Sequence, residues 1–263
     1  MDPRNSLFEK YMFQFLNLEK NTDVYNEAAM TAITGFNGNL VNQINYYAQA
    51  GVNEGVNPIH MLTRSNQEGM NKKTYGSVSG TYSTDYGKYT PEGYSLNGYY
   101  NYFNVGAYTT SKASATVNGL AYAKQQGWNS IYKAIAGGSA VVANNYVKKG
   151  QNTIYFEKFN VVYKDKLYSH QYMTNVQAAM SEGSNMGRAY TDKSQAFVFR
   201  IPVYQNMPAS AAPFKDSGNP NNWLSSITVE GYSLTPVFNG ATTAYTLVVG
   251  DNVGSINIGA TAV

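Results

Sequence analysis

Residues 37–51 have the hydrophobic pattern of an amphipathic helix. Their apolar residues recur three and four positions apart, which places them on one face, and Gly51 provides a stop signal. These apolar residues are Leu40, Val41, Ile44, Tyr47 and Ala48. We therefore expect a helix with one buried side.

A second helix is predicted to begin after Asn57 and to end at about Glu68. Asn57 is a good capping residue, and Pro58 suits the first helical position because no backbone N–H is needed there. His60, Arg64 and Glu68 follow one another at intervals of four residues, so they lie along one side of the helix. This spacing places a carboxylate in the last turn, one turn after an arginine.

The pattern changes in residues 69–108, which hold nine tyrosines and many Gly, Ser, Thr and Asn residues without a helical period. We expect a lobe of loops and short strands here. Helical patterns return in residues 115–127, 130–150 and 169–183, where Ser169 is a suitable cap. The predicted fold class is therefore α+β, with a mostly helical domain and a small β-lobe.

A second shift in composition occurs in residues 206–222, which are rich in Pro, Ala, Asn and Ser. Such a stretch is typical of a linker. Beyond it, apolar and polar residues alternate in three segments, as in half-buried strands; the segments are 225–234, 242–250 and 255–263. They are too short for a complete β-sandwich, which needs ~100 residues, so we expect the chain to be an excerpt of a longer protein.

Composition narrows the possible functions of the 263 residues. The formal charge is only +3 and the basic residues are scattered, which argues against a nucleic-acid partner and is compatible with an anionic polymer such as a cell wall. The absence of cysteine excludes disulfides, thiolate zinc sites and cysteine nucleophiles. Two histidines without thiolates predict no metal site, and the Gly-rich stretches match no nucleotide motif, so we expect no cofactor.

No stretch approaches the ~18 to 20 consecutive apolar residues that a membrane span requires. The first ten residues also lack the apolar region of a signal peptide. We therefore expect no membrane insertion, and either a cytoplasmic protein or one whose leader was removed.

Carboxylates are scarce after Glu68. Between Gly69 and Phe156 the chain contains only Asp85 and Glu92. Hydrolysis of a glycosidic bond needs a proton donor and commonly a second carboxylate, so Glu68 with Asp85 or Glu92 is a candidate pair. In the alternative interpretation Glu68 is an ordinary solvated helix end, which Arg64 would hold in its ionised form.

The tyrosines of residues 69–108 have two interpretations as well. Their rings can pack against the C–H face of a sugar while their hydroxyls form hydrogen bonds. They can equally fill the core of a thin lobe that has few other large side chains. The tyrosines concerned are Tyr82, Tyr86, Tyr89 and Tyr94.

Seven ordered segments carry a resemblance to a known family. They are NPIHMLTRSNQEG, SGTY, GYYNYFNVGAY, AKQQGW, YVKKGQNTIYFEKFNVV, YSHQYMTNVQAAMSEG and FRIPVYQNMP, and the opening MDPRNSLFEKYMFQFL extends the match. Over about residues 1–208 the chain resembles the endo-β-N-acetylglucosaminidases of glycoside hydrolase family 73, which are peptidoglycan-cleaving autolysins of Gram-positive, often clostridial, bacteria. The resemblance implies a lysozyme-like fold.

The resemblance also implies roles for individual residues. The family's catalytic acid closes an Arg-x-Arg-Gln-Glu motif, which Arg64, Gln67 and Glu68 match while Asn66 replaces the second arginine. Glu68 is thus implied as general acid and Arg64 and Gln67 as substrate-binding. The second signature implies that Tyr99, Tyr100, Asn101 and Phe103 shape the groove, with Tyr100 near the reacting sugar. Glu92 or Asp85 is a weaker match to a second catalytic group, which the substrate's own acetamido group replaces in some members.

We therefore expect an N-terminal extension (1–35), a catalytic domain (36–208), a linker (209–222) and the start of a cadherin-like β-module (223–263). The predicted function is cleavage of the β-1,4 bond between N-acetylglucosamine and N-acetylmuramic acid by a secreted, cell-wall-associated monomer whose partner is the peptidoglycan glycan strand. The alternatives are a weakly active wall-binding module, a muramidase or a lytic transglycosylase. Analysis of the reducing ends of digested peptidoglycan separates them.

Overall fold

The computed structural model describes residues 2–19, 39–70, 72, 75–82, 95–190, 193–194, 196–211, 224–240, 242 and 244–262. The chain forms two compact units, Met1–Pro213 and Phe214–Val263. The division falls inside the stretch predicted as a linker, and the exact domain boundaries stay a prediction. Within the described residues, none of the helices has both the length and the apolar character needed to cross a bilayer.

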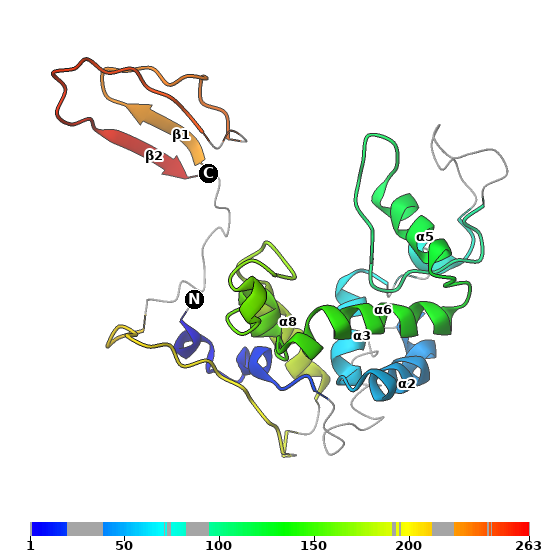
Figure 1. Ribbon diagram of the computed structural model, residues 1–263. Helices are drawn as coiled ribbons and strands as arrows, with labels where there is room; N and C mark the ends of the chain where they lie inside the picture. The colour runs from blue at the N-terminus through cyan, green and yellow to red at the C-terminus, as the bar shows by residue number, and fades with distance from the viewer. Residues whose placement is uncertain are drawn as a thin grey trace. The chain divides into compact units, whose positions relative to one another are not determined.

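The described part of the first unit is built from helices and connecting loops (Figure 1). The α-helices are α2 (Ile44–Glu54), α3 (Pro58–Gln67), α4 (Gly76–Ser79), α5 (Ala115–Gln125), α6 (Ile131–Asn145), α7 (Ile154–Phe159) and α8 (Ala178–Ala189). Short 3-10 helices are η1 (Pro3–Ser6), η2 (Met12–Phe15), η3 (Asn39–Gln43), η4 (Val147–Lys149) and η5 (Lys164–Lys166). The mostly helical α+β fold class is confirmed.

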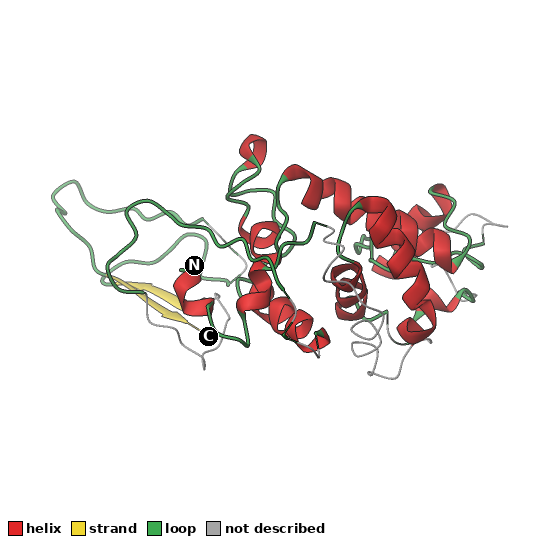
Figure 2. Cartoon of the chain, turned by 90° about the horizontal axis from the view of Figure 1, so that it is seen from below, coloured by secondary structure: helices red, strands yellow, loops and turns green. Residues whose placement is uncertain are grey.

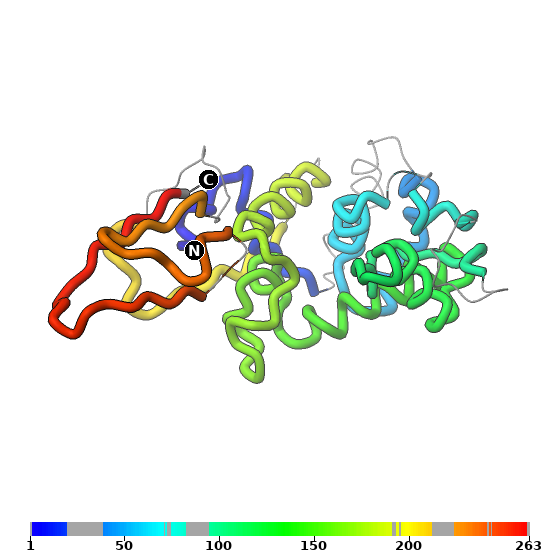
Figure 3. The backbone as a smooth tube through the Cα atoms, turned by 90° about the horizontal axis from the view of Figure 1, so that it is seen from above, coloured from blue at the N-terminus to red at the C-terminus, as the bar shows by residue number. Residues whose placement is uncertain are grey.

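Helix α3 is the central element of this unit. It packs against α2 and α8, and α2, α3 and α6 form one cluster in two views of the backbone (Figures 1 and 3). Every residue from Pro58 to Ser65 is buried. The helix begins as predicted, because the Asn57 side chain accepts a hydrogen bond of 2.9 Å from the N–H of Ile59. It ends at Glu68, which is therefore attached to a largely buried helix.

The first predicted helix extends beyond its expected stop. Residues 39–43 form η3, and α2 then continues to Glu54 and ends at Gly55, whose φ of 69° is left-handed. Gly51 lies inside the helix instead. A Cβ atom at Gly51 would come within 2.5 Å of Cγ of Pro58, so this glycine permits close packing between the start of α3 and the end of α2.

The predicted strands in residues 69–108 are not found in the part of this stretch that the structure describes, which contains α4 and turns. Residues 83–94, with Tyr86, Tyr89 and Tyr94, lie outside the described residues. Asn101 organises the loop that follows. Its side chain donates to the carbonyl groups of Val105 and Gly119 at 2.8 and 2.9 Å, which ties this loop to α5.

The helix predicted over residues 169–183 begins later, at Ala178, so Ser169 is not its cap. Hydrogen bonds to α7 hold the preceding segment in an irregular loop. Lys158 of α7 donates to Oε1 of Gln171 at 2.9 Å and to the carbonyl oxygen of Met173 at 2.5 Å. The backbone N–H of Tyr172 also donates to the carbonyl oxygen of Glu157 at 2.9 Å, so these bonds together hold Tyr172 against α7.

The N-terminal residues pack closely on α8. A Cβ atom at Gly183 would come within 2.5 Å of the backbone nitrogen of Gln14 in η2, so only glycine permits this contact. Leu16 also forms an isolated antiparallel bridge with Phe199. The opening segment and the segment near residue 200 are thus both part of the first unit.

The second unit contains a two-stranded antiparallel sheet, shown in yellow in Figure 2. Strand β1 (Leu224–Val229) pairs with β2 (Ile258–Ala262), so that Val229 lies opposite Ile258. Both strands fall in segments predicted from alternation. In the middle predicted segment, 242–250, the described residues form no strand, and Thr246 forms only an isolated bridge with Thr235.

Candidate active site

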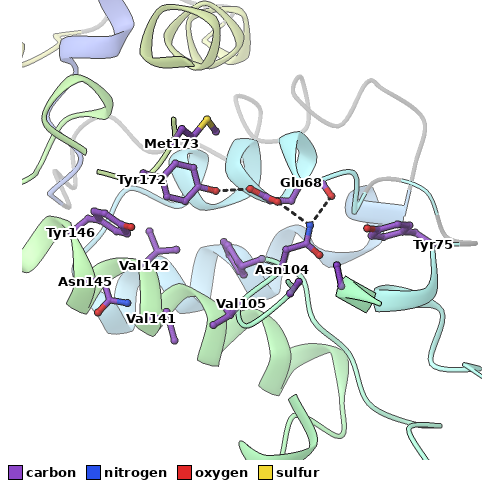
Figure 4. A pocket seen from close by; sticks show the side chains of 13 residues that line it. Glu68, Tyr75, Asn104, Val105, Val141, Val142, Asn145, Tyr146, Tyr172 and Met173 are labelled. Atoms are coloured by element: carbon purple, nitrogen blue, oxygen red, sulfur yellow. Dashed lines mark hydrogen bonds between the residues drawn. The ribbon is translucent and has the colours of Figure 1, made fainter. Parts of the chain in front are cut away.

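Glu68 lies on the wall of a pocket in the first unit (Figure 4). The cavity volume is about 390 Å³. Its described lining comes from the end of α3, the first residue of α5, α6 and the loops around residues 75, 104 and 172. The lining residues are Glu68, Tyr75, Phe103, Asn104, Val105, Ala107, Ala115, Val141, Val142, Asn145, Tyr146, Tyr172 and Met173. Glu68 is the one carboxylate among them.

Both oxygens of the Glu68 carboxyl group accept a hydrogen bond. The Tyr172 hydroxyl donates to Oε1 at 2.5 Å, and Nδ2 of Asn104 donates to Oε2 at 2.9 Å. Asn104 also donates to the backbone carbonyl oxygen of Glu68 at 3.3 Å. The half-buried carboxyl group is therefore held in one orientation, facing the pocket (Figure 4).

Asn104 reaches Glu68 because of the loop that carries it. Its φ of 51° is left-handed, a conformation that asparagine tolerates better than most residues. Asn101, which is fully buried, fixes this turn by accepting from the backbone N–H of Val105 at 3.1 Å. Phe103 anchors the loop to α6, where Gly138 leaves room for its ring.

Tyr172 is held from two sides. The centroid of its ring lies 3.6 Å from Cζ of Arg64, and its backbone N–H donates to the carbonyl oxygen of Glu157 at 2.9 Å. Burial raises the pKa of the Tyr172 hydroxyl well above its usual value, and neighbouring Glu68 adds to this effect while Arg64 opposes it. Tyr172 is therefore a neutral phenol at physiological pH, available as a hydrogen-bond donor to Glu68.

A buried cluster of charged residues lies behind Tyr172. Nη2 of Arg64 pairs with Oε2 of Glu157 and, at 3.0 Å, with Oε2 of Glu182. Nε2 of His60 lies 3.3 Å from Oε1 of Glu157. All four side chains are at most 6% exposed. The cluster joins α3, α7 and α8 beneath the pocket.

The two acids of this cluster differ in their pKa. Burial raises the pKa of Glu157, but the charges of Arg64 and His60 outweigh burial and leave it below its usual value. Burial also raises the pKa of Glu182, and there Arg64 and His60 do not fully offset it, because Glu157 opposes them. The geometry agrees with this difference, because Arg64 lies closer to Glu157 than to Glu182.

Aromatic and aliphatic side chains form the rest of the pocket wall. Tyr75, Tyr146 and Tyr172 border it, and Val141 and Val142 line it along α6 (Figure 4). Tyr146 meets the Tyr172 ring edge to face, with centroids 5.7 Å apart. Aromatic faces near a few hydrogen-bonding groups suit a sugar ring.

The residues of the first matched motif occupy three different positions. Glu68 lies at the pocket, and Gln67 is exposed beside it, with Nε2 3.9 Å from the sulfur of Met173. Arg64 is only 1% exposed. A guanidinium group with this burial has no surface to offer a substrate, so its place differs from the substrate-binding role implied by the resemblance.

The second matched segment contributes to the pocket mainly through Phe103 and the unpredicted Asn104. Tyr99, Tyr100 and Asn101 are not among the lining residues. The Tyr100 hydroxyl lies against Gly80, where a Cβ atom would clash with it, and Asn101 holds the loop instead of facing the pocket. Asp85 and Glu92 lie outside the described residues.

Sequence reasoning missed Asn104, Tyr146 and Tyr172. Tyr172 lies within the helix predicted over residues 169–183 and Tyr146 within the one predicted over 130–150, so the hydrophobic period did not mark either residue as part of a site. All three do lie in segments that carried the family resemblance. A comparison of those segments with the family, residue by residue, was the signal that could have identified these three residues.

The chemistry of the site is that of a positioned carboxyl group and a phenol. Among the described residues, no group of three or more His, Asp or Glu side chains is arranged to hold a metal ion. A carboxyl group with fixed orientation beside an aromatic cleft can transfer a proton to or from a bound sugar.

The sequence comparison identifies staphylococcal relatives. The chain is 31% identical over 194 residues, or 73% of its length, to a bifunctional autolysin of Staphylococcus epidermidis. It is 29% identical over 195 residues to a bifunctional autolysin of Staphylococcus aureus. The match spans only 14% and 15% of those relatives. No protein-family model matches the chain.

Solved structures share the fold. A crystal structure of a major bifunctional autolysin superposes with a TM-score of 0.53 at 27% identity, covering 77% of this chain and 78% of the other. Autolysin E of S. aureus gives a TM-score of 0.55 at 23% identity, over 75% of this chain and 79% of the other. A catalytic glutamate-to-alanine mutant of autolysin E, solved with the disaccharide NAG-NAM, gives 0.53 at 22% identity, over 73% and 78%.

Proposed function

The chain is homologous to the bacterial autolysins and shares their fold, and from this premise we propose that it hydrolyses the β-1,4 bond between N-acetylglucosamine and N-acetylmuramic acid in peptidoglycan. The resemblance to family 73 glucosaminidases predicted from the sequence is confirmed. The observation that carries the proposed chemistry is the position of Glu68, whose oxygens are oriented by two donors at the edge of an aromatic pocket.

Glu68 is the proposed general acid. It delivers a proton to the oxygen of the leaving sugar as the glycosidic bond breaks. The Tyr172 hydroxyl can donate to the carboxylate and accept from the carboxylic acid, because a phenol does both. The pair therefore stays connected in both protonation states, and Asn104 keeps the other oxygen in place.

The glycan is proposed to bind along the wall formed by Tyr75, Tyr146 and Tyr172. Their rings offer faces for sugar C–H groups, while Asn104 and Asn145 offer amides for hydroxyl or acetamido groups. The solved complexes of autolysin E with a muropeptide and with NAG-NAM support this ligand class. Because the proposed substrate is a wall polymer, we propose that the protein is secreted and acts at the cell wall. We also propose that it acts as a monomer.

A second catalytic group is proposed from the residues that the structure does not describe. The candidates are Glu92 and Asp85, because they are the only carboxylates between Gly69 and Phe156. Glu92 is the first candidate and Asp85 the second. Participation by the substrate's acetamido group is the competing scheme. Loss of turnover in Glu92→Gln or in Asp85→Asn supports a catalytic carboxylate and identifies which of the two it is, whereas wild-type rates in both variants support the acetamido group.

Analysis of new reducing ends on purified peptidoglycan tests the proposed bond. We expect N-acetylglucosamine at these ends. N-acetylmuramic acid would identify a muramidase, an anhydro-sugar a transglycosylase, and the absence of new ends a binding module, and each would overturn the proposal.

The assignment of the acid is tested with Glu68→Gln, which we expect to lower turnover by ~10² to 10⁴-fold, the range for loss of a general acid. Glu54→Gln is the matched control, since Glu54 ends the neighbouring helix α2 and pairs with Lys148 at 2.8 Å, away from the pocket lining. Turnover near the wild-type value in Glu68→Gln contradicts the assignment.

A further inference from the structure

We propose that Arg64 is a positioning residue that acts on the reaction through Tyr172, by supporting the ring whose hydroxyl orients Glu68. The inference rests on the proposed function of Glu68. It gives Arg64 a role in turnover without contact with substrate.

The contacts form a continuous path from Arg64 to the acid. The guanidinium carbon lies 3.6 Å from the centroid of the Tyr172 ring. The hydroxyl of the same ring donates to Oε1 of Glu68 at 2.5 Å. Arg64 and Glu68 are both carried by α3, one turn apart, so Tyr172 links two residues of a single buried helix.

The hydrogen bonds of Arg64 do not involve the face of its guanidinium group, and this face stacks on the Tyr172 ring. Both acids bind the same nitrogen, Nη2, whereas Nε and Nη1 are buried and have no hydrogen-bond partner among the residues that the structure describes. Burial of two polar N–H nitrogens without partners costs free energy. A cation stacked on an aromatic ring gains more when the pair is shielded from water, and this stacking on Tyr172 offsets part of that cost.

The two acids anchor Arg64 from different helices. Glu157 belongs to α7 and Glu182 to α8, and the carbonyl oxygen of Glu157 also accepts from the backbone N–H of Tyr172. One residue of α7 therefore holds both partners of the stack. A displacement of the guanidinium plane would be transmitted to the tyrosine, and misplacement of a reacting group by about 1 Å can cost ~10²-fold in rate.

A double-mutant cycle distinguishes this role from simple structural support. Arg64→Lys keeps the charge but removes the planar group. We expect it to lower kcat about tenfold or more in the full chain with KM changed less than twofold. In a Tyr172→Phe background, which already lacks the hydroxyl, Arg64→Lys should lower kcat less than twofold further, because coupled residues are not additive. Arg200→Lys, an exposed arginine paired with Glu19, is the control and should change neither value.

Equal losses of kcat from Arg64→Lys in both backgrounds would overturn the proposal and leave Arg64 a structural residue. If Arg64→Lys does not fold, Glu182→Gln replaces it in the same cycle, since it loosens only one of the two anchors of Arg64. Wild-type turnover by Glu68→Gln would instead overturn the proposed acid, and that result is separate from the coupling measured here.

Discussion

At the residue scale, the site depends on two side chains that orient one acid. Glu68 was predicted from its place at the end of a helix and from the matched motif. Its partners were not, because Asn104 and Tyr172 lie 36 and 104 residues away in the sequence. Periodicity identifies residues that share a helix face, but it does not identify contacts between distant loops. The burial of Arg64 was not predicted either, since sequence spacing does not reveal burial.

The two candidate tyrosines can be compared directly. We expect Tyr172→Phe to lower turnover by ~10²-fold or more, of the order seen when a preorganised hydrogen bond is removed. Tyr100→Phe should have a much smaller effect, because the Tyr100 hydroxyl packs at Gly80 and the residue does not line the pocket. The measurement is kcat and KM for both variants on one soluble glycan. A larger loss for Tyr100→Phe would restore the role implied by the family resemblance.

At the element scale, local signals predicted the start of α3 well and the start of α8 poorly. The cap at Asn57 and the proline that follows act within a few residues, so the sequence contains the whole signal. The segment before α8 has a helical pattern too, but hydrogen bonds from Lys158 hold it against α7. This tertiary override of propensity is what places Tyr172 beside Glu68.

Helix α6 offers a test of how an element positions the site. In a helix interior, Gly→Ala is normally stabilising by roughly 0.5 to 1 kcal/mol. At Gly138 the new methyl group would clash with the Phe103 ring, and overpacking typically costs ~1 to 3 kcal/mol. We therefore expect Gly138→Ala to lower the melting temperature and also kcat, because Phe103 precedes Asn104 in the loop that holds Glu68.

The control for this substitution is Asn144→Ala on the exposed side of the same helix. It replaces a weak helix former with a strong one, so the melting temperature should stay equal or rise. An unchanged melting temperature in Gly138→Ala would mean that Phe103 moves aside at little cost and that the loop is not fixed by this contact.

At the scale of the whole molecule, composition and periodicity predicted a mostly helical domain followed by a segment of strands. These features are averaged over many residues, so single errors at Gly51 or Ser169 do not alter the class. The assembly of the pocket is different, since it combines residues of α3, α5, α6 and three loops. Each loop is positioned by a few specific hydrogen bonds, which no average property of the sequence encodes.

The division into two units gives the last prediction. The first unit, Met1–Pro213, contains every described residue of the pocket and the buried charge cluster behind it. A chain that ends near Ser217 should therefore keep the melting temperature of the first unit and its kcat on soluble glycan fragments. Activity on intact cell walls is measured in parallel, because an attached module that binds the wall raises local concentration without changing kcat. A sharp fall in melting temperature or in kcat on the soluble fragments would show that residues after 217 stabilise the catalytic unit.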